Sequence, residues 1–162
     1  MRISFDLDDT IILTGDGCLY EAPLKFPYSL FYKEQLRSGM VALCKELVSL
    51  GWEICIYTTS ERSVNYIRNL FKQYGISLYN IINQQIHQEI VQGTRKEIQP
   101  SKFPSRFGID LHIDDDRSVK QNGLQYGFNV LIIDRKDEQW TSKILDEAIR
   151  IIKRKESMQN HF

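Results

Sequence analysis

The segment Ile3-Ser4-Phe5-Asp6-Leu7-Asp8-Asp9-Thr10 joins a short apolar run to three acidic side chains. An apolar run of this length, bounded by polar residues, predicts a buried strand over residues 3–7. The acidic residues lie at the carboxyl end of that strand. They are therefore the first residues in the chain to examine for chemistry.

The rest of the chain alternates between short apolar runs and longer segments in which apolar residues recur every three or four positions. Further strands are expected at 53–57, 78–82, 109–113 and 129–133, and helices at about 35–50, 60–74, 117–126 and 137–153. Ser60 is the expected cap of the second helix. This alternation predicts an α/β fold, a doubly wound parallel sheet of about five strands with helices on both faces.

The composition is that of an ordinary globular protein, with 42% hydrophobic and 26% charged residues among 162. The length predicts one domain over residues 1–153, followed by a polar tail at 154–162 that is expected to fray. Lys plus Arg and Asp plus Glu each number 21, so the net charge is zero. A neutral chain gives no clear signal for binding nucleic acid or an anionic membrane.

The cysteines and the first residues indicate a soluble cytoplasmic protein. Cys18, Cys44 and Cys55 form no CxxC pair, and the last two lie inside apolar patterns, which is typical of free buried thiols. Acidic residues follow the initial Met too soon for a signal peptide. No apolar run is long enough to predict a membrane span.

Two stretches do not fit the alternation. Residues 11–34 contain many aromatic and turn-forming residues, and residues 83–107 are polar and are expected to be mostly irregular. Long loops of this kind are often functional. The first stretch is interpreted either as a flap over the site or as a loop packed on the core.

Polar groups follow three of the expected strands. They are Asp6-Leu7-Asp8-Asp9-Thr10, Thr58-Thr59-Ser60 and Asp114-Asp115-Asp116, and Lys102 precedes the last group by twelve positions. Each group has a simpler interpretation as turn formers or helix caps. Carboxylates from two strands, however, repel one another unless a cation lies between them. Ligands that are all oxygen favour Mg²⁺ over Ca²⁺ here, because the carboxylates are few and a phosphate can complete the octahedron.

These groups together resemble the four motifs of the haloacid dehalogenase superfamily. Phe5-Asp6-Leu7-Asp8-Asp9-Thr10 is similar to the first motif, and Ile54-Cys55-Ile56-Tyr57-Thr58 to the second. Lys102 is the best candidate for the basic third motif, although Lys96 and its basic neighbours share the same stretch. Leu111-His112-Ile113-Asp114-Asp115 is similar to the fourth motif. The resemblance covers most of the chain and implies a member without a full cap domain, because both insertion points are short.

The resemblance implies a role for each motif residue. Asp6 would be the nucleophile and Asp8 the general acid and base, which is expected to be buried beside Asp6. The metal, Mg²⁺, would be held by Asp6, by Asp8 (through its carbonyl) and by Asp114. Asp115 would either reach the metal through water or brace Lys102. The transferred phosphoryl group would be bound by Thr58, Thr59 and Lys102. His112 is expected to be a packed core histidine.

The expected function is that of a Mg²⁺-dependent phosphoric monoester hydrolase that forms an aspartyl-phosphate. Its partner would be a phosphorylated small molecule or a phosphoprotein, and an oligomer is possible. The alternatives are a phosphotransferase or phosphomutase of the same superfamily, and a catalytically silent phosphate-binding module. A phosphorylation-switch receiver domain is a further alternative, but its motifs occur in another order.

Overall fold

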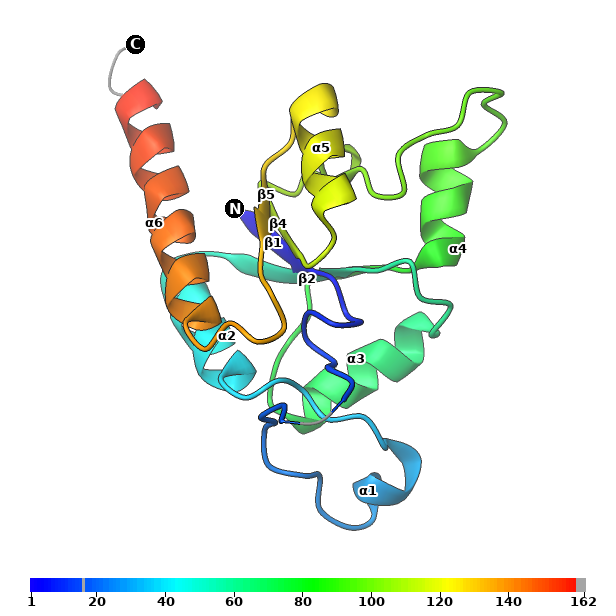
Figure 1. Ribbon diagram of the computed structural model, residues 1–162, viewed down its shortest axis with the longest axis vertical. Coiled ribbons are helices and arrows are strands. Elements are labelled where there is room, and N and C mark those ends of the chain that lie inside the picture. Colours follow the sequence, from blue (N-terminus) through cyan, green and yellow to red (C-terminus); the bar gives the residue numbers. More distant parts are fainter. Residues whose placement is uncertain (16, 160–162) are drawn as a thin grey trace.

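The computed structural model describes residues 1–15 and 17–159, and within them it contains a five-stranded parallel sheet (Figure 1). The elements follow in the order β1 (Arg2–Phe5), α1 (Tyr28–Phe31), α2 (Met40–Ser49), β2 (Glu53–Tyr57), α3 (Val64–Gln73), β3 (Asn80–Ile82), α4 (Gln84–His87), η1 (Gln88–Gln92), η2 (Pro104–Phe107), β4 (Leu111–Asp114), α5 (Arg117–Tyr126), β5 (Val130–Ile132) and α6 (Trp140–Gln159). Here η1 is a π-helical turn and η2 a 3-10 turn. The predicted α/β fold is confirmed.

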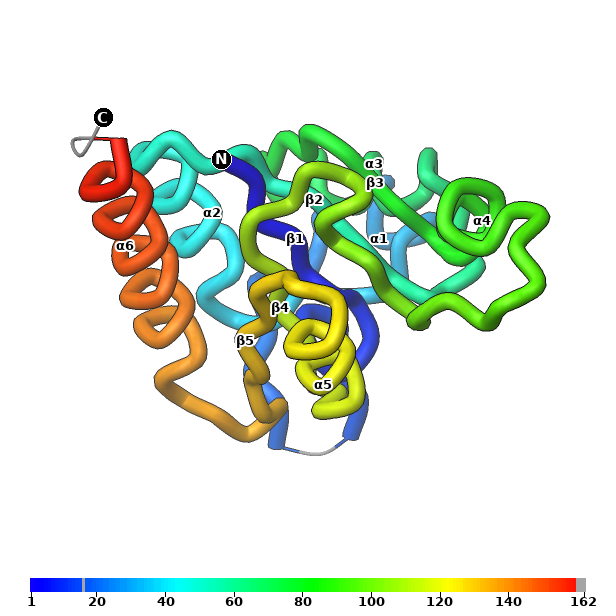
Figure 2. Tube along the Cα trace, turned by 90° about the horizontal axis from the view of Figure 1, so that it is seen from above, coloured from blue at the N-terminus to red at the C-terminus, as the bar shows by residue number. Residues whose placement is uncertain are grey.

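Helices cover both faces of the sheet. Helices α2 and α3 lie on one face, while α5 and the α4–η1 segment lie on the other (Figures 1 and 2). Helix α6 packs along α2 and so belongs to the first face. No helix in the described part of the chain combines the length and apolar character needed to cross a membrane.

The two faces of the sheet differ in polarity because side chains alternate along each strand. The main apolar core lies on the face covered by α2, α3 and α6, and its strand residues are Ile3, Phe5, Ile54, Ile56, Ile81, Leu111 and Ile113. On the opposite face, Ser4, Tyr57 and His112 are completely buried and carry polar atoms. This second face therefore holds a buried polar network that continues into the site described below.

In the strand order β3-β2-β1-β4-β5, strands β2 and β3 are added on one side of β1, and β4 and β5 on the other. The site lies at the carboxyl ends of β1 and β4, where the order switches sides. Strands β1 and β4 are neighbours, although β2 and β3 come between them in sequence. In open α/β sheets the ligand crevice lies beyond the carboxyl ends of the strands at this switch point. The order also differs from the 2-1-3-4-5 order of flavodoxin-like folds, to which receiver domains belong.

Helix α2 begins at Met40, later than the predicted residue 35, because the preceding residues are extended. The amide of Arg37 donates to the carbonyl oxygen of Ile11 at 2.7 Å. The buried guanidinium of Arg37 donates to the carbonyl oxygens of Thr10, at 3.3 Å, and Asp134, at 3.1 Å. Arg37 therefore ties together the segments that follow β1 and β5.

Helix α3 also begins later than predicted, at Val64. Its cap is Ser63, whose hydroxyl accepts a hydrogen bond from the amide of Tyr66 at 3.2 Å. Ser60, the predicted cap, instead accepts from the amide of Arg62 within the β2–α3 loop. The β2–α3 loop is thus three residues longer than predicted, because the cap of α3 is Ser63 rather than Ser60.

The prediction that residues 83–107 are mostly irregular is wrong in part. Asn83 caps α4, its side-chain oxygen accepting from the amide of Ile86 at 3.1 Å, and the helical path continues through η1 to Gln92. A further turn, η2, spans Pro104–Phe107. The segment between them, residues 93–103, carries Lys102.

Helix α6 continues to Gln159, although the tail from Arg154 was expected to fray. Lys155, in this extension, forms an ion pair with Asp110 at 2.5 Å, which connects the helix to the start of β4. Residues 160–162 of the predicted tail lie outside the described residues.

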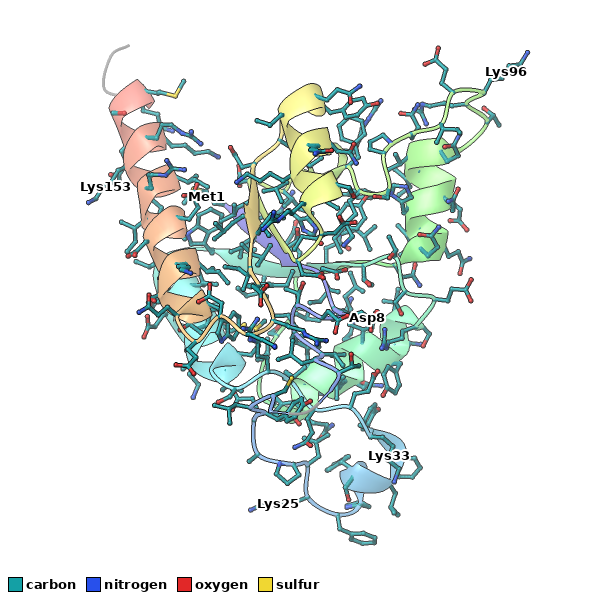
Figure 3. The ribbon with its side chains drawn as sticks, in the orientation of Figure 1. Met1, Asp8, Lys25, Lys33, Lys96 and Lys153 are labelled. Carbon is teal, nitrogen blue, oxygen red and sulfur yellow. The ribbon has the colours of Figure 1, made fainter. Side chains whose placement is uncertain are left out.

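The stretch 11–34 leaves the body of the protein as an extended loop around α1, the lowest part of Figure 1. Lys25 and Lys33 lie on this loop, and Asp8 lies close to its origin (Figure 3). Phe26 and Phe31 are exposed. The tip of the loop is therefore not packed on the core, whereas Leu24 and Tyr32 of the same stretch do pack against it, so the packed-loop interpretation holds for only part of the stretch.

Candidate active site

Asp6 and Asp114 lie side by side at the carboxyl ends of β1 and β4. Asp6 directly follows β1, and Asp114 is the last residue of β4. The amide of Asp6 donates to the carbonyl oxygen of Ile113 at 2.9 Å, which continues the strand pairing to this point. The two carboxylates are therefore placed by the register of the sheet rather than by a flexible loop.

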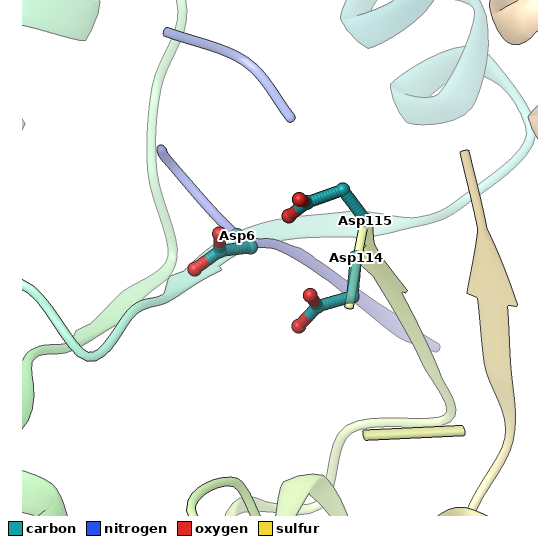
Figure 4. A group of neighbouring side chains, drawn as sticks. All are labelled: Asp6, Asp114 and Asp115. Carbon is teal, nitrogen blue, oxygen red and sulfur yellow. The ribbon is translucent and has the colours of Figure 1, made fainter. Parts of the chain in front are cut away.

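Asp115 adds a third carboxylate to this pair. One oxygen each from Asp6, Asp114 and Asp115 lies within 4.8 Å of the others, and Figure 4 shows the three side chains on the same side of the strands. Asp6 and Asp114 are buried, and Asp115 is half-buried. Because these ligand atoms are all carboxylate oxygens, the group could hold a hard metal ion.

Lys102 lies between the two buried carboxylates. Its ammonium is 2.6 Å from Oδ1 of Asp6 and 2.6 Å from Oδ2 of Asp114. The neighbouring Phe103 is held by its amide, which donates to the hydroxyl of Tyr57 at 2.8 Å. Tyr57 ends β2, so the segment that carries Lys102 is fixed to the same edge of the sheet.

The charges in this cluster do not balance. Three carboxylates and one ammonium leave two negative charges in a largely buried space. Burial, together with the charge of Asp114, raises the pKa of Asp6 to about 6, although Lys102 opposes the shift. Burial likewise raises the pKa of Asp115. A divalent cation would remove this excess of negative charge.

Asp114 differs from its two neighbours because it receives three hydrogen bonds. Burial alone would raise its pKa, but His112 and Lys102 outweigh burial and the pKa of Asp114 is lowered. His112 Nε2 lies 2.9 Å from Oδ2 of Asp114, and the amide of Asp116 donates to Oδ1 at 2.9 Å. Asp114 is thus fixed as the charged partner of Lys102.

His112 is buried in the sheet, which confirms the prediction of a core position, but it also supports the site. Its Nδ1 lies 2.7 Å from the hydroxyl of Ser4, and its Nε2 contacts Asp114. A chain of contacts therefore runs from Ser4 through His112 and Asp114 to Lys102. The sequence did not indicate this, although the period-two pattern puts Ser4, His112 and Asp114 on one face of the sheet.

The turn after β1 brings Thr10 to the cluster. Asp9 has a positive φ of 57°, and its amide donates to the carbonyl oxygen of Ile12 at 3.0 Å. This tight turn lets the buried hydroxyl of Thr10 donate to Oδ1 of Asp115 at 3.2 Å. Asp9 itself accepts from Thr14 and shapes the turn.

Thr58 and Thr59 follow β2, the strand on the other side of β1. Thr58 is buried, and its hydroxyl oxygen accepts from the amide of Ser60 at 3.1 Å; Thr59 is exposed. In the described part of the chain, neither threonine is hydrogen-bonded to the carboxylates or to Lys102. They line the same edge of the sheet as separate hydrogen-bonding groups.

Asp8 is placed differently from the sequence prediction. Its side chain is 52% exposed, not buried beside Asp6, and it is not one of the clustered carboxylates. Both of its oxygens accept from the guanidinium of Arg62, at 2.8 and 2.9 Å. Arg62, which sequence reasoning missed, belongs to the β2–α3 loop, and no periodicity or motif singled it out.

The other basic residues of this stretch are Arg95, Lys96 and Arg106, and the first and last of them contact groups other than the clustered carboxylates. Arg95 donates to the carbonyl oxygen of Val91 at 2.6 Å, and Arg106 lies over the ring of Phe103. Lys96 is exposed on the loop at the upper right of Figure 3. Of the four candidates, Lys102 contacts Asp6.

A polar cavity of about 400 Å³ lies beside the site. It is lined by Thr59, Glu61, Gln84, His87, Gln88, Gln92, Ile98, Gln99 and Ser101. Thr59 and Ser101 are sequence neighbours of Thr58 and Lys102, so the cavity adjoins the carboxyl ends of the strands. Its side-chain amides can both donate and accept hydrogen bonds.

Comparisons with known proteins add little. No family model matches the chain, and no curated protein matches its sequence. Among solved structures, a chain from "Structure of Pnkp1/Rnl/Hen1 complex" is similar with a TM-score of 0.47 and 15% sequence identity. The alignment covers 82% of this chain and 45% of that one, so this chain spans less than half of its length. A similarity at this level carries no argument about activity.

Proposed function

We propose that the protein is a Mg²⁺-dependent phosphoric monoester hydrolase of the haloacid dehalogenase type. The observation that carries the proposal is the ammonium of Lys102, 2.6 Å from both Asp6 and Asp114 at the switch point of the sheet. The four sequence motifs that resemble this superfamily lie at the same edge. A site that combines acidic ligands with a buried lysine suits an anionic substrate bound together with a cation.

The residues present fit a magnesium ion. Asp6 and Asp114 would provide direct oxygen ligands and Asp115 an oxygen that acts through water, and the backbone carbonyl of Asp8 is proposed as a further ligand. When bound, Mg²⁺ supplies charge compensation that allows a carboxylate and a phosphate to approach each other. Lys102 supplies part of the same compensation from the protein itself.

Asp6 is proposed as the nucleophile. One of its carboxylate oxygens attacks phosphorus, the bond from phosphorus to the ester oxygen breaks, and Asp8 donates a proton to the leaving alcohol. Water then attacks phosphorus, Asp8 accepts its proton, and the bond to Asp6 breaks. The products are an alcohol and inorganic phosphate, and both carboxyl groups return to their first state.

The remaining predicted residues would bind the phosphoryl group. Lys102 would neutralise charge on the phosphoryl oxygens and orient Asp6, because it already contacts that carboxylate. Thr58 would donate through its hydroxyl and Thr59 through its amide. Asp115, held by Thr10, would act on the metal through water.

The substrate is proposed to be a phosphorylated small molecule or a phosphoprotein. The described residues include no full cap domain over the strand ends, and the polar cavity beside Thr59 is proposed to receive part of the substrate. The receiver-domain alternative is disfavoured because the strand order is not the one those domains have.

Hydrolysis of p-nitrophenyl phosphate tests the proposal. Wild-type protein is expected to release phosphate with Mg²⁺ and to stop when the metal is chelated. Asp6→Asn is expected to remove turnover while leaving the fold intact, and Asp146→Asn, at an exposed position of α6, is the matched control that keeps it.

Turnover by Asp6→Asn at the wild-type rate would contradict the assigned nucleophile. Transfer of the phosphoryl group to an added alcohol in preference to water would indicate a phosphotransferase. Normal folding without any Mg²⁺-dependent turnover would favour the silent phosphate-binding module.

A further inference from the structure

The guanidinium of Arg62 lies between two carboxylates at the rim of the site. It donates to both oxygens of Asp8, at 2.8 and 2.9 Å, and its Nε donates to both oxygens of Glu34, at 3.0 and 3.2 Å. It also donates to the hydroxyl of Ser60 at 2.7 Å. Each donor atom of the planar group is therefore used, which defines its orientation.

Arg62 is itself held by the protein. Its carbonyl oxygen accepts from the side-chain amide of Asn83 at 3.1 Å, and Asn83 also caps α4. Its side chain is 23% exposed, compared with 52% for Asp8. The more exposed Asp8 side chain is thus held by a better buried partner, and a two-bond Arg–carboxylate contact fixes both the position and the plane of the carboxylate.

We propose that Arg62 is a positioning residue for Asp8, and that Glu34 keeps Arg62 in place. The inference rests on the proposed function, in which Asp8 transfers the proton to and from the leaving group. Arg62 holds the Asp8 carboxylate at the edge of the site, two positions along the chain from Asp6. It touches neither Asp6 nor Lys102, so it acts through Asp8.

Glu34 explains how Asp8 can leave this pair during the reaction. Arg62 contacts two carboxylates, so its positive charge is still compensated by Glu34 when Asp8 leaves the pair, takes up from water the proton that it donates, and turns toward the substrate. An unpaired, partly buried guanidinium would instead oppose that movement. Glu34 lies at the end of the stretch 11–34, and the same contact therefore anchors this loop beside the site.

A series of para-substituted phenyl phosphates, from p-nitrophenyl phosphate to phenyl phosphate, tests the inference. These probes have similar shapes, but their phenolate leaving groups become poorer from p-nitrophenolate to phenolate. Expulsion of a poor leaving group depends more on proton donation by a general acid. Arg62→Gln is expected to lower kcat for phenyl phosphate about a hundredfold, near the lower limit for loss of a general acid. The loss for p-nitrophenyl phosphate is expected to be much smaller, and KM should change little in either case.

Asp8→Asn provides the comparison within the same series. It is expected to show the same dependence on the leaving group, and the double variant should be no slower than Asp8→Asn alone, because Arg62 acts through Asp8. Arg62→Lys should restore only part of the rate, since an ammonium cannot make the two-bond contact. Arg68→Gln, the same chemical change at an exposed position of α3, is the control.

Equal losses along the whole series, a change confined to KM, or multiplication of the Asp8 and Arg62 effects would each overturn the inference. If Arg62→Gln fails to fold, the comparison uses Arg62→Lys and Glu34→Gln, which are expected to show a smaller loss with the same leaving-group dependence. Wild-type protein that is inactive on every probe would overturn the proposed function and the inference with it. An active, Asp6-dependent enzyme with an unchanged Arg62→Gln variant would overturn the inference alone.

Discussion

Lys102 determines the charge balance of the site. Its ammonium is buried and contacts two carboxylates that are also buried, Asp6 and Asp114. Removal of one partner from a buried ion pair is costly because it leaves a charge without compensation. The same residue is therefore expected to matter for stability as well as for phosphate binding.

Lys102→Met is expected to lower the free energy of unfolding by about 3–5 kcal/mol, the usual cost of breaking a buried ion pair. Mg²⁺ should restore part of this loss, because a cation can replace the ammonium between the carboxylates. Urea denaturation with Mg²⁺ and with chelator measures both effects. The matched control is Lys96→Met, on an exposed loop, and equal stability of the two variants would contradict this account.

At the scale of single residues, the sequence predicted which groups would gather but not what supports them. Asp6 and Asp114 were identified because strand ends meet at one edge of a parallel sheet, and Lys102 was identified through the resemblance to the third family motif. Arg62 was missed because its role depends on a contact across 54 positions, which no local pattern records. Asp8 was expected to be buried, but the turn after β1 directs it outward to Arg62.

The strands and long helices were predicted because their apolar periodicity reflects the core that they bury. The errors lie at element ends, where a tertiary contact competes with the helical pattern. Leu36 is apolar and in helical register, yet Arg37 pairs with Ile11, so α2 starts only at Met40. The short helix α4 has too few residues for periodicity, and its one local signal was the cap Asn83.

Helix α5 approaches β5 so closely that its one interior glycine is required. A Cβ added at Gly123 would lie 2.6 Å from the carbonyl oxygen of Phe128 and 3.1 Å from Val130 Cγ2. Alanine normally stabilises a helix by about 1 kcal/mol relative to glycine. In α5 the backbone contact reverses that preference.

Gly123→Ala is therefore expected to destabilise the protein by about 1–3 kcal/mol, the usual cost of overpacking. Thermal unfolding measures the change. Gln125→Ala, at an exposed position of the same helix, should be nearly neutral. A stabilised Gly123→Ala variant would mean that α5 lies farther from β5 than described.

At the scale of the whole molecule, the order of the strands places the chemistry. Strands β1 and β4 are neighbours only because the chain crosses the sheet between β3 and β4, and this crossing brings Asp6 beside Asp114. The crossing segment also carries Lys102. One topological feature therefore assembles both carboxylates and the ammonium between them.

The central claim is that Asp6 accepts a phosphoryl group beside a magnesium ion. Beryllofluoride, a tetrahedral mimic of a phosphoryl group bound to a carboxylate, tests it without knowledge of the natural substrate. With Mg²⁺ it should raise the thermal unfolding midpoint of the wild type, since a ligand at about 100 times its Kd stabilises by about 2.7 kcal/mol. The rise should be absent in Asp6→Asn and retained in Asp146→Asn. An equal rise in Asp6→Asn, or none in the wild type, would contradict the account.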